Sequence, residues 1–497
     1  MVTTATVATT RNGKVEGREK EGVLLFAGIP YAEPPVGELR FRAVQPHEPW
    51  SGVRPAQKFG PAAPQLAGTG LTNSVAVRWD EDCLTLNIST PAVDDRKRPV
   101  LVWIHGGAFK TGQGGTPWYN GARFAANGDI VVVSINYRLA ALGFAHLARF
   151  GDDFAASGIN GILDQIEALK WVRDNIEAFG GDPENVTIAG ESAGAFSVGS
   201  LLASPMATGL FQRAIAQSGA AHHALPSEAS NIVTDILLEQ LEATTIEDIQ
   251  TAPVESILEA QDKVALELLK RPKGLGTTIG AFYPTIDGAV LPKLPIDLVR
   301  DGASKDVPVV VGSNKDETTL WGAPEDIDDE GLRKLLDRLG GSPNMIDTYR
   351  QNRPDATSRD LYVAMTTDHT FRIPAIRLAE AREPHGAQTW MYHFAWESRA
   401  FNGTLKSTHA LEIPFAFDNL DRGGVNVFLG EGPSPQHVAD SMHAAWTSFI
   451  RTGDPGTETR PWPAYESAER ATMVFGDETA VANDPNGDER EAWAGRR

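Results

Sequence analysis

Short apolar runs rich in β-branched residues recur along the chain, and each has the length of one buried strand. The apolar character is continuous within each run, which suits a sheet that is covered on both faces. Helical periodicity separates the runs, and this alternation predicts an α/β fold with a large, mostly parallel central sheet and helices on both faces. The runs are Arg98–Ile104, Asp129–Asn136, Asn185–Gly190, Arg213–Gly219, Val307–Ser313 and Gln388–Trp396.

One helix is well marked between these runs. Apolar residues from Leu163 to Phe179 recur at steps of three and four, and Gly180–Gly181 ends the pattern. Two further regions, at about 225–305 and 321–387, are more helical and carry charged faces. We expect them to be helical insertions that cover an active site, within a single domain over residues 1–497.

Charge and composition exclude several kinds of partner. The chain has 45 Lys plus Arg against 65 Asp plus Glu, a net charge of −20, which argues against binding to nucleic acid. The sequence has no run of about 18 apolar residues, so neither a transmembrane helix nor a membrane partner is expected. The first residues lack the apolar segment of a signal peptide, so a cytoplasmic location is expected, with a monomer as the default state.

Gly190, Ser192 and Gly194 form a G-x-S-x-G pattern that follows an apolar run and precedes a helix-like segment. This setting is typical of a nucleophile elbow, a tight strand-to-helix turn that exposes a serine hydroxyl. The motif alone is weak, because glycine and serine also mark ordinary loops. A nucleophilic serine also needs a base that is oriented by an acid, and backbone N–H donors for the oxyanion.

Candidate oxyanion donors lie in Trp103–Phe109, which follows a predicted strand. Gly106 and Gly107 allow their N–H groups to approach a substrate closely, because no Cβ blocks the way. The third donor would be the N–H of Ala193, next after the nucleophile. The alternative is a glycine turn that only ends the strand.

An acid and a base must follow Ser192 in the chain if the elbow is of this kind. Asp316 and Glu317 come directly after a predicted strand, where α/β sheets place functional groups, although a pair of acids at a helix start is the simpler explanation. His409 lies in the loop-like stretch STHALEIPFAF and is the favoured base. Chain order leaves three other histidines open, His369, His385 and His393.

Segments that match one known family occur in order along almost the whole chain, among them FAGIPYAEPPVGELRF, DEDCLTLNI, WIHGGAF, INYRLAALGF, GINGILDQ, FGGDPENVTIAGESAG, AQSGA and THALEIPFAF. Through them the sequence resembles the type B carboxylesterase family, far more specifically than through G-x-S-x-G alone. The resemblance implies an α/β-hydrolase fold and a catalytic triad of Ser192, Glu317 and His409. Glu317 falls on the glutamate of the family's D-E-G triplet, and His409 on the histidine of H-x-x-E-[IL]-P-F.

The resemblance also implies roles around the triad. Glu191 would modulate the triad from beside the nucleophile, Ser218 would support the acid and the base, and Glu412 could help to fix the histidine loop. Plain core packing is an equal alternative for each aromatic residue that we expect to contact substrate. The expected substrate contacts are Phe109, Leu320, Trp321 and Phe371.

The chain departs from its family at two positions. Thr318 replaces the glycine of D-E-G, and we expect its backbone to stay at negative φ, since β-branched residues avoid positive φ. Ala63 stands where many relatives have a cysteine that pairs with the one in E-D-C-L. Cys83, the only cysteine, is therefore expected to be a free, buried thiol.

These residues predict a serine carboxylesterase that hydrolyses small-molecule esters, with short or medium acyl groups and aryl esters, through an acyl-enzyme. No cofactor or metal is expected, since the sequence has no H-E-x-x-H motif and no cluster of Cys and His. Two alternatives remain. One is a carbamate or amide hydrolase with the same triad, and the other is a non-catalytic interaction protein of the same fold.

Overall fold

The structure is a computed structural model that describes residues 6–67, 77–270 and 280–496. The chain forms two compact units. Unit 1 consists of Met1–Ile215 and Ala221–Ser304, and unit 2 of Ala216–Ala220 and Lys305–Arg497. Within the described ranges, no helix combines the length and the apolar character that crossing a bilayer requires.

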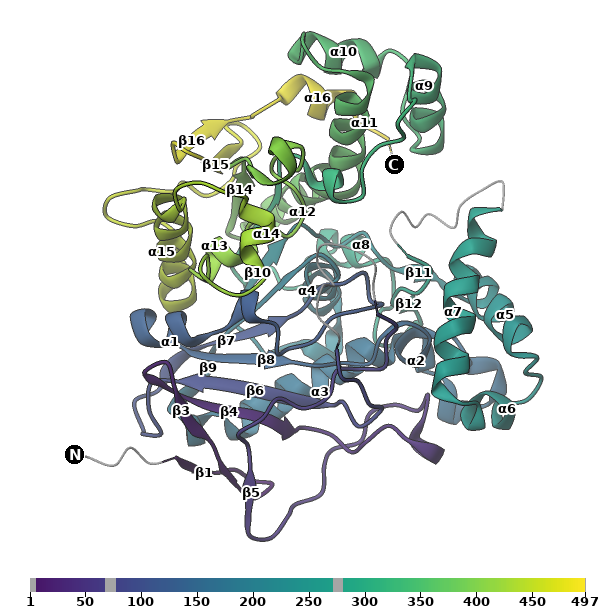
Figure 1. Ribbon diagram of the computed structural model, residues 1–497, viewed down its shortest axis with the longest axis vertical. Coiled ribbons are helices and arrows are strands. Elements are labelled where there is room, and N and C mark those ends of the chain that lie inside the picture. Colours follow the sequence, from purple (N-terminus) through teal and green to yellow (C-terminus); the bar gives the residue numbers. More distant parts are fainter. Residues whose placement is uncertain (1–5, 68–76, 271–279, 497) are drawn as a thin grey trace. The chain divides into compact units, whose positions relative to one another are not determined.

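Unit 1 is built on a sheet with a parallel centre and an antiparallel side (Figure 1). Strand β7 (Arg98–Ile104) pairs in parallel with β8 (Val131–Ile135) on one side and with β9 (Gly181–Glu191) on the other. All of β8 and nearly all of β7 is buried, as the continuous apolar runs predict. The antiparallel side continues from β8 through β6 (Thr85–Thr90), β4 (Val23–Pro30) and β3 (Arg18–Lys20).

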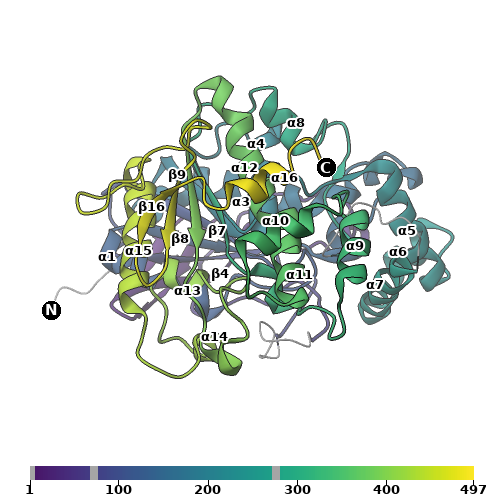
Figure 2. The same ribbon diagram turned by 90° about the horizontal axis from the view of Figure 1, so that it is seen from above.

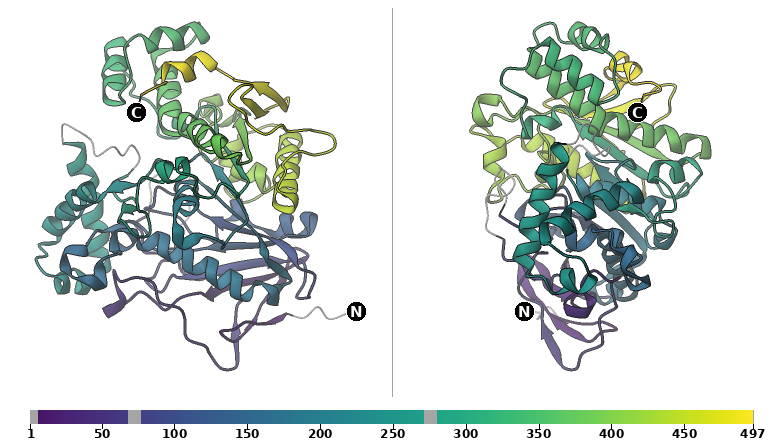
Figure 3. Two further views of the ribbon diagram at one scale, coloured as in Figure 1. Left: turned by 180° about the vertical axis from the view of Figure 1, so that it is seen from behind. Right: turned by 90° about the vertical axis from the view of Figure 1, so that its right-hand side faces the viewer.

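Helices pack on this sheet and extend from it. The predicted apolar stripe forms α3 (Asn160–Asn175) and the short turn after it, and Gly180 ends this segment at a φ of 77°. Helix α5 packs on α7 within a helical group that Figures 2 and 3 show. The other elements of the unit are α1 (Ala122–Gly128), α2 (Ala140–Phe144), α4 (Ala193–Ala203), α5 (Ser227–Leu241), α6 (Ile246–Thr251), α7 (Val254–Leu269), α8 (Pro295–Arg300) and the short strands β1 (Val7–Thr9), β2 (Lys14–Glu16), β5 (Val53–Pro55), β11 (Leu225–Pro226) and β12 (Thr285–Ile286).

Unit 2 repeats the strand and helix alternation. Strands β13 (Val309–Asn314), β14 (Thr389–Phe394) and β15 (Ala471–Phe475) run parallel, and β16 (Ala480–Asn483) closes the edge antiparallel. Helices α9, α10 and α11 form a group within this unit (Figure 2). The helices are α9 (Asp329–Arg338), α10 (Met345–Asn352), α11 (Ser358–Thr367), α12 (Ile373–Arg382), α13 (Ile413–Ala416), α14 (Val425–Leu429), α15 (Gln436–Thr452) and α16 (Gly487–Ala492).

Each apolar run that the sequence marks as a strand overlaps one, in the order β7, β8, β9, β10, β13 and β14, and β9 extends beyond its run at both ends. Strand β10 (Arg213–Gln217) begins in unit 1 and ends in unit 2. The region predicted as the first insertion holds α5 to α8 together with β11 and β12, and the second holds α9 to α12. The covering role of these regions stays a prediction.

Strand register brings predicted site residues to one sheet edge within unit 1. Ile104 of β7 lies opposite Gly190 of β9. Because the two strands are parallel, the residues that follow them leave the sheet at the same edge. Gly106 and Ser192 therefore come together, although 86 positions (192 − 106) separate them in the chain.

Candidate active site

The G-x-S-x-G motif forms a sharp turn between β9 and α4. Ser192 has a φ of 56° and a ψ of −122°, a conformation that residues with a Cβ rarely adopt. The flanking glycines are required by crowding. A Cβ on Gly190 would lie 2.5 Å from the carbonyl carbon of Gly194, and a Cβ on Gly194 only 2.0 Å from the carbonyl oxygen of Ile104. This strained strand-to-helix turn is the geometry of a nucleophile elbow.

The loop after β7 lies directly against this serine. A Cβ on Gly106 would lie 2.6 Å from the carbonyl oxygen of Glu191 and 3.1 Å from the Cβ of Ser192. Gly107 has a φ of 110°, which side-chain-bearing residues rarely adopt. Ala193 opens helix α4, so its N–H belongs to the first turn, where N–H groups have no partner within the helix. The three predicted oxyanion donors thus belong to segments that meet in unit 1.

Glu317 and His409 form a buried pair in unit 2. The Nδ1 atom of His409 lies 2.5 Å from Oε2 of Glu317, and the backbone N–H of His409 donates to the Glu317 carbonyl at 3.2 Å. The other carboxylate oxygen accepts the N–H of Asn314 at 2.7 Å. Glu317 has no exposed surface and His409 is 4% exposed. The Glu317 carboxylate therefore fixes the proton on Nδ1, which leaves Nε2 able to accept a proton.

The other candidates for acid and base lie elsewhere. The carboxylate of Asp316 receives the N–H of Ser407 at 3.4 Å, and burial raises its pKa. His385 is exposed, in a short turn after α12. His369 lies with its ring centroid 5.5 Å from that of Trp493.

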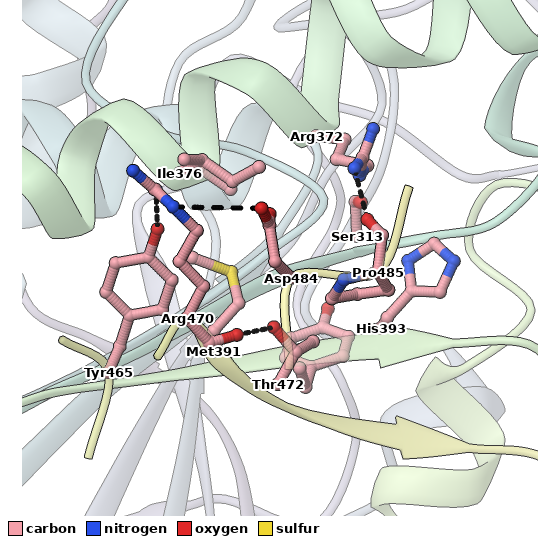
Figure 4. A pocket seen from close by; sticks show the side chains of 12 residues that line it. Ser313, Arg372, Ile376, Met391, His393, Tyr465, Arg470, Thr472, Asp484 and Pro485 are labelled. Atoms are coloured by element: carbon pink, nitrogen blue, oxygen red, sulfur yellow. Dashed lines mark hydrogen bonds and ion pairs between the residues drawn. The ribbon is translucent and has the colours of Figure 1, made fainter. Parts of the chain in front are cut away.

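His393 lines a small cavity of unit 2 beside β14 and α12 (Figure 4). The volume of about 20 Å³ is the size that one water molecule needs. The charges at this cavity are compensated, since Arg470 pairs with the Asp484 carboxylate at 4.0 Å and Arg372 with the Asp368 carboxylate at 3.0 Å. Burial and the neighbouring cations, Arg372 first, lower the pKa of His393 to about 3, so its ring is neutral at pH 7.

Thr318 adopts the backbone that the sequence argument expects. It lies in the short helical turn Glu317–Leu320, and it is absent from the residues with positive φ in the described part of the chain. Its hydroxyl lies 2.7 Å from that of Thr366 and 3.2 Å from the Val363 carbonyl, both on α11. The threonine that replaces the family glycine thus anchors the turn of the acid to a neighbouring helix.

A second carboxyl group, Glu412, lies beside the pair and is fully buried. Its oxygens accept hydrogen bonds from Asn314 Nδ2 at 2.6 Å and from Gln217 Nε2 at 3.2 Å. Burial first, and then the negative charge of Glu317, raise the pKa of Glu412 to about 7. Sequence reasoning named Glu412 only as a possible support of the histidine loop and missed the two amides, because buried amides carry no motif.

The predicted substrate contacts fall in two places. Trp321 stacks parallel to Phe371 at 6.3 Å, and both rings lie about 5 Å from the His409 ring (5.0 and 4.9 Å). Trp321 is 52% exposed, and Leu320, its neighbour in the chain, is half-buried. Phe109 instead lies in unit 1 with no exposed surface, packed edge-on against Phe144 at 5.0 Å.

Two remaining expectations concern single residues. Ser218 belongs to unit 2, where its N–H donates to the Gly312 carbonyl of β13 at 2.9 Å. Cys83 is a free, fully buried thiol, as expected, and burial raises its pKa. In the described ranges, no group of three or more His, Cys, Asp or Glu residues could hold a metal ion.

The chain belongs to the carboxylesterase family, whose pattern it matches over residues 4–493. It is 38% identical over 495 residues to the para-nitrobenzyl esterase of Bacillus subtilis (strain 168), with 98% of both chains covered. It is 39% identical over 498 residues to the phenmedipham hydrolase of Pseudarthrobacter oxydans, with 97% of both chains covered.

Solved structures agree. The Geobacillus stearothermophilus carboxylesterase at pH 6.2 has a TM-score of 0.88 and 41% identity, covering 98% of this chain and all of the other. The predicted α/β-hydrolase fold and the carboxylic ester hydrolase class are confirmed. The non-catalytic alternative loses its support, because the two bacterial relatives are named as an esterase and a hydrolase.

Proposed function

We propose that the protein is a serine carboxylesterase with a triad of Ser192, His409 and Glu317. The observation that carries the proposal is the strained turn at Ser192, since a serine at a φ of 56° beside a glycine loop has no evident structural purpose. The short bond between His409 and Glu317 supports the assignment of base and acid.

The reaction proceeds in two acyl-transfer steps. Ser192 Oγ attacks the ester carbonyl carbon while His409 Nε2 takes its proton, and Glu317 stabilises the imidazolium that forms. The N–H groups of Gly106, Gly107 and Ala193 bind the oxyanion of the tetrahedral intermediate. The C–O bond to the alcohol then breaks, and His409 returns the proton to the leaving oxygen. In the second step water attacks the acyl-enzyme, with His409 again as base and then as acid, and the carboxylic acid is released from Ser192.

Buried groups around the triad would adjust its charge. Glu191 is 3% exposed and lies against Gly106, so it would influence the positive charge that develops on the histidine. Ser218 is fully buried and would support the loop that carries the acid through its bond to β13.

The proposed substrates are esters with short or medium acyl groups, including aryl esters. The exposed face of Trp321, stacked on Phe371, offers a flat apolar surface beside the base, and Leu320 adjoins it. Phe109, which the sequence places in the same role, would act only as support because it has no exposed surface. Similarity to the para-nitrobenzyl esterase favours the same class.

Carbamate hydrolysis by the same triad is the second candidate, and the similarity to a phenmedipham hydrolase favours it. The chemistry differs only in the leaving group and in the fit of the pocket. The monomeric state and the cytoplasmic location stay predictions from the sequence, and light scattering of the purified chain tests the first.

The test is a panel of p-nitrophenyl acetate, p-nitrophenyl butyrate, aryl carbamates and anilides at equal concentration, with Ser192→Ala as the matched control. We expect kcat/KM to be highest for the aryl esters, and Ser192→Ala to lose at least about 10³-fold while staying folded. Carbamates turned over faster than esters would favour the second candidate. A folded Ser192→Ala that kept more than about a hundredth of the activity would refute the triad.

A further inference from the structure

Gln65 lies outside the turn and the strands of the site, yet its side chain binds the loop that follows β7. Its Nε2 donates to the Gly112 carbonyl at 2.9 Å, and its Oε1 accepts the Gly112 N–H at 2.9 Å. The same Nε2 donates to the Ala63 carbonyl at 2.9 Å. Gln65 is 5% exposed. Both amide hydrogens and the amide oxygen are thus committed to backbone, which fixes the orientation of Gly112.

Gly112 is in direct contact with the start of the same loop. It has a φ of 115°, and a Cβ there would lie 2.3 Å from Nδ1 of His105 and 2.6 Å from the carbonyl oxygen of Gly106. His105 Nδ1 lies 2.8 Å from that oxygen, which can only accept, so Nδ1 carries the proton. Burial lowers the pKa of His105 to about 4, which keeps the ring neutral at pH 7. Tyr137 donates to the His105 carbonyl at 2.8 Å.

The loop between these contacts, Gly106–Gly112, is under backbone strain. Ala108 and Phe109 both have a φ of 56°, in the left-handed region that residues with a Cβ avoid. Within the loop, the N–H groups of Lys110 and Thr111 both donate to the Gly107 carbonyl at 2.9 Å. A strained turn of this kind persists only when its surroundings hold it, and Gln65 holds its far end.

We propose that Gln65 is a positioning residue for the oxyanion hole, which holds Gly112 and through it the Gly106 and Gly107 N–H groups in place. The proposal rests on the proposed function, since it needs Gly106 and Gly107 to be the oxyanion donors. Gln65 does not touch the reacting atoms. Its contribution appears only when charge develops on the carbonyl oxygen. Donors displaced by about 1 Å lose much of their stabilisation of the transition state, whereas binding of the uncharged substrate changes little.

The test compares two variants. Gln65→Met keeps the volume of the side chain and loses every hydrogen bond. Gln65→Asn keeps the amide group on a shorter side chain, which cannot reach both the N–H and the carbonyl of Gly112. The matched control is Asn175→Leu. Asn175 is also a buried amide with two backbone bonds, to Trp171 O at 2.9 Å and from Arg11 N–H at 2.7 Å, at the far end of α3. Thermal unfolding of all three variants measures the structural cost alone.

With p-nitrophenyl butyrate we expect both Gln65 variants to lose about 10- to 100-fold in kcat with KM within about twofold. A trifluoromethyl ketone, which forms an alkoxide on the serine, should lose affinity by a similar factor, whereas Asn175→Leu should lower only the unfolding temperature. Unchanged kcat in a folded Gln65→Met, or a rise in KM alone, would overturn the inference. Its failure is distinct from that of the triad, because Ser192→Ala reports on the triad in the same assay.

Discussion

At the scale of single residues, the assignment of the acid depends on which carboxylate faces the histidine. Glu317 bonds to His409 Nδ1 with one oxygen and accepts the Asn314 N–H with the other. An amide at this position has to place its oxygen toward Asn314, so its NH₂ group would face the histidine and force Nδ1 to accept. Nε2 would then carry the proton and could not take one from Ser192.

Glu317→Gln should therefore lower kcat by about 10⁴-fold, with little change in fold. Asp316→Asn should change kcat by less than about threefold, since an amide oxygen can still accept the Ser407 N–H. Steady-state kinetics on the two purified variants decide between the acids. A crippled Asp316→Asn beside an active Glu317→Gln would move the assignment by one position.

At the scale of elements, Glu412 joins three segments of unit 2. Asn314 ends β13, Gln217 ends β10, and Glu412 itself immediately precedes α13. Gln217 is held in turn by the Trp446 indole of α15, which donates to its oxygen at 3.0 Å. A carboxyl that stays protonated in this setting links the strands through hydrogen bonds without adding a second charge next to Glu317.

A pH-dependent stability follows from the raised pKa of Glu412. The folded chain keeps this proton up to about pH 7, whereas the unfolded chain releases it near the usual value of 4.5. The native state binds more protons between these values, so wild-type stability should fall relative to Glu412→Gln as pH rises from 5 to 7, by at most about 3 kcal/mol. Unfolding temperatures of both chains at pH 5, 6, 7 and 8 measure this. A gap that is constant with pH would contradict the raised pKa.

The sequence predicts these elements unequally, for physical reasons. Strands β7 and β8 are long apolar runs and could be recognised, whereas the exposed edge strands β3 and β16 carry no such signal. The predicted pairing of Glu317 with His409 rested on family motifs. The bonds of Gln65 to Gly112 and of Glu412 to Asn314 and Gln217 could not be predicted, because they join residues distant in sequence. Their partners are backbone groups, which every residue has, or buried amides, which carry no motif.

At the scale of the whole molecule, the residues of the proposed triad divide between the units. Unit 1 contains Ser192 with Gly106 and Gly107, and unit 2 contains Glu317 with His409. A serine hydroxyl is a weak nucleophile alone, so the proposed reaction requires His409 to act as its base. Activation of Ser192 by His409 is therefore what the proposed function most depends on.

Covalent labelling tests this claim most directly. A fluorophosphonate reacts when an activated serine oxygen attacks phosphorus and displaces fluoride, so it reports the activated residue itself. We expect one adduct per chain, mapped by peptide mass spectrometry to Ser192, and its loss in His409→Ala at matched concentration and time. An adduct on another residue, or labelling of Ser192 that is equally fast in His409→Ala, would contradict the account.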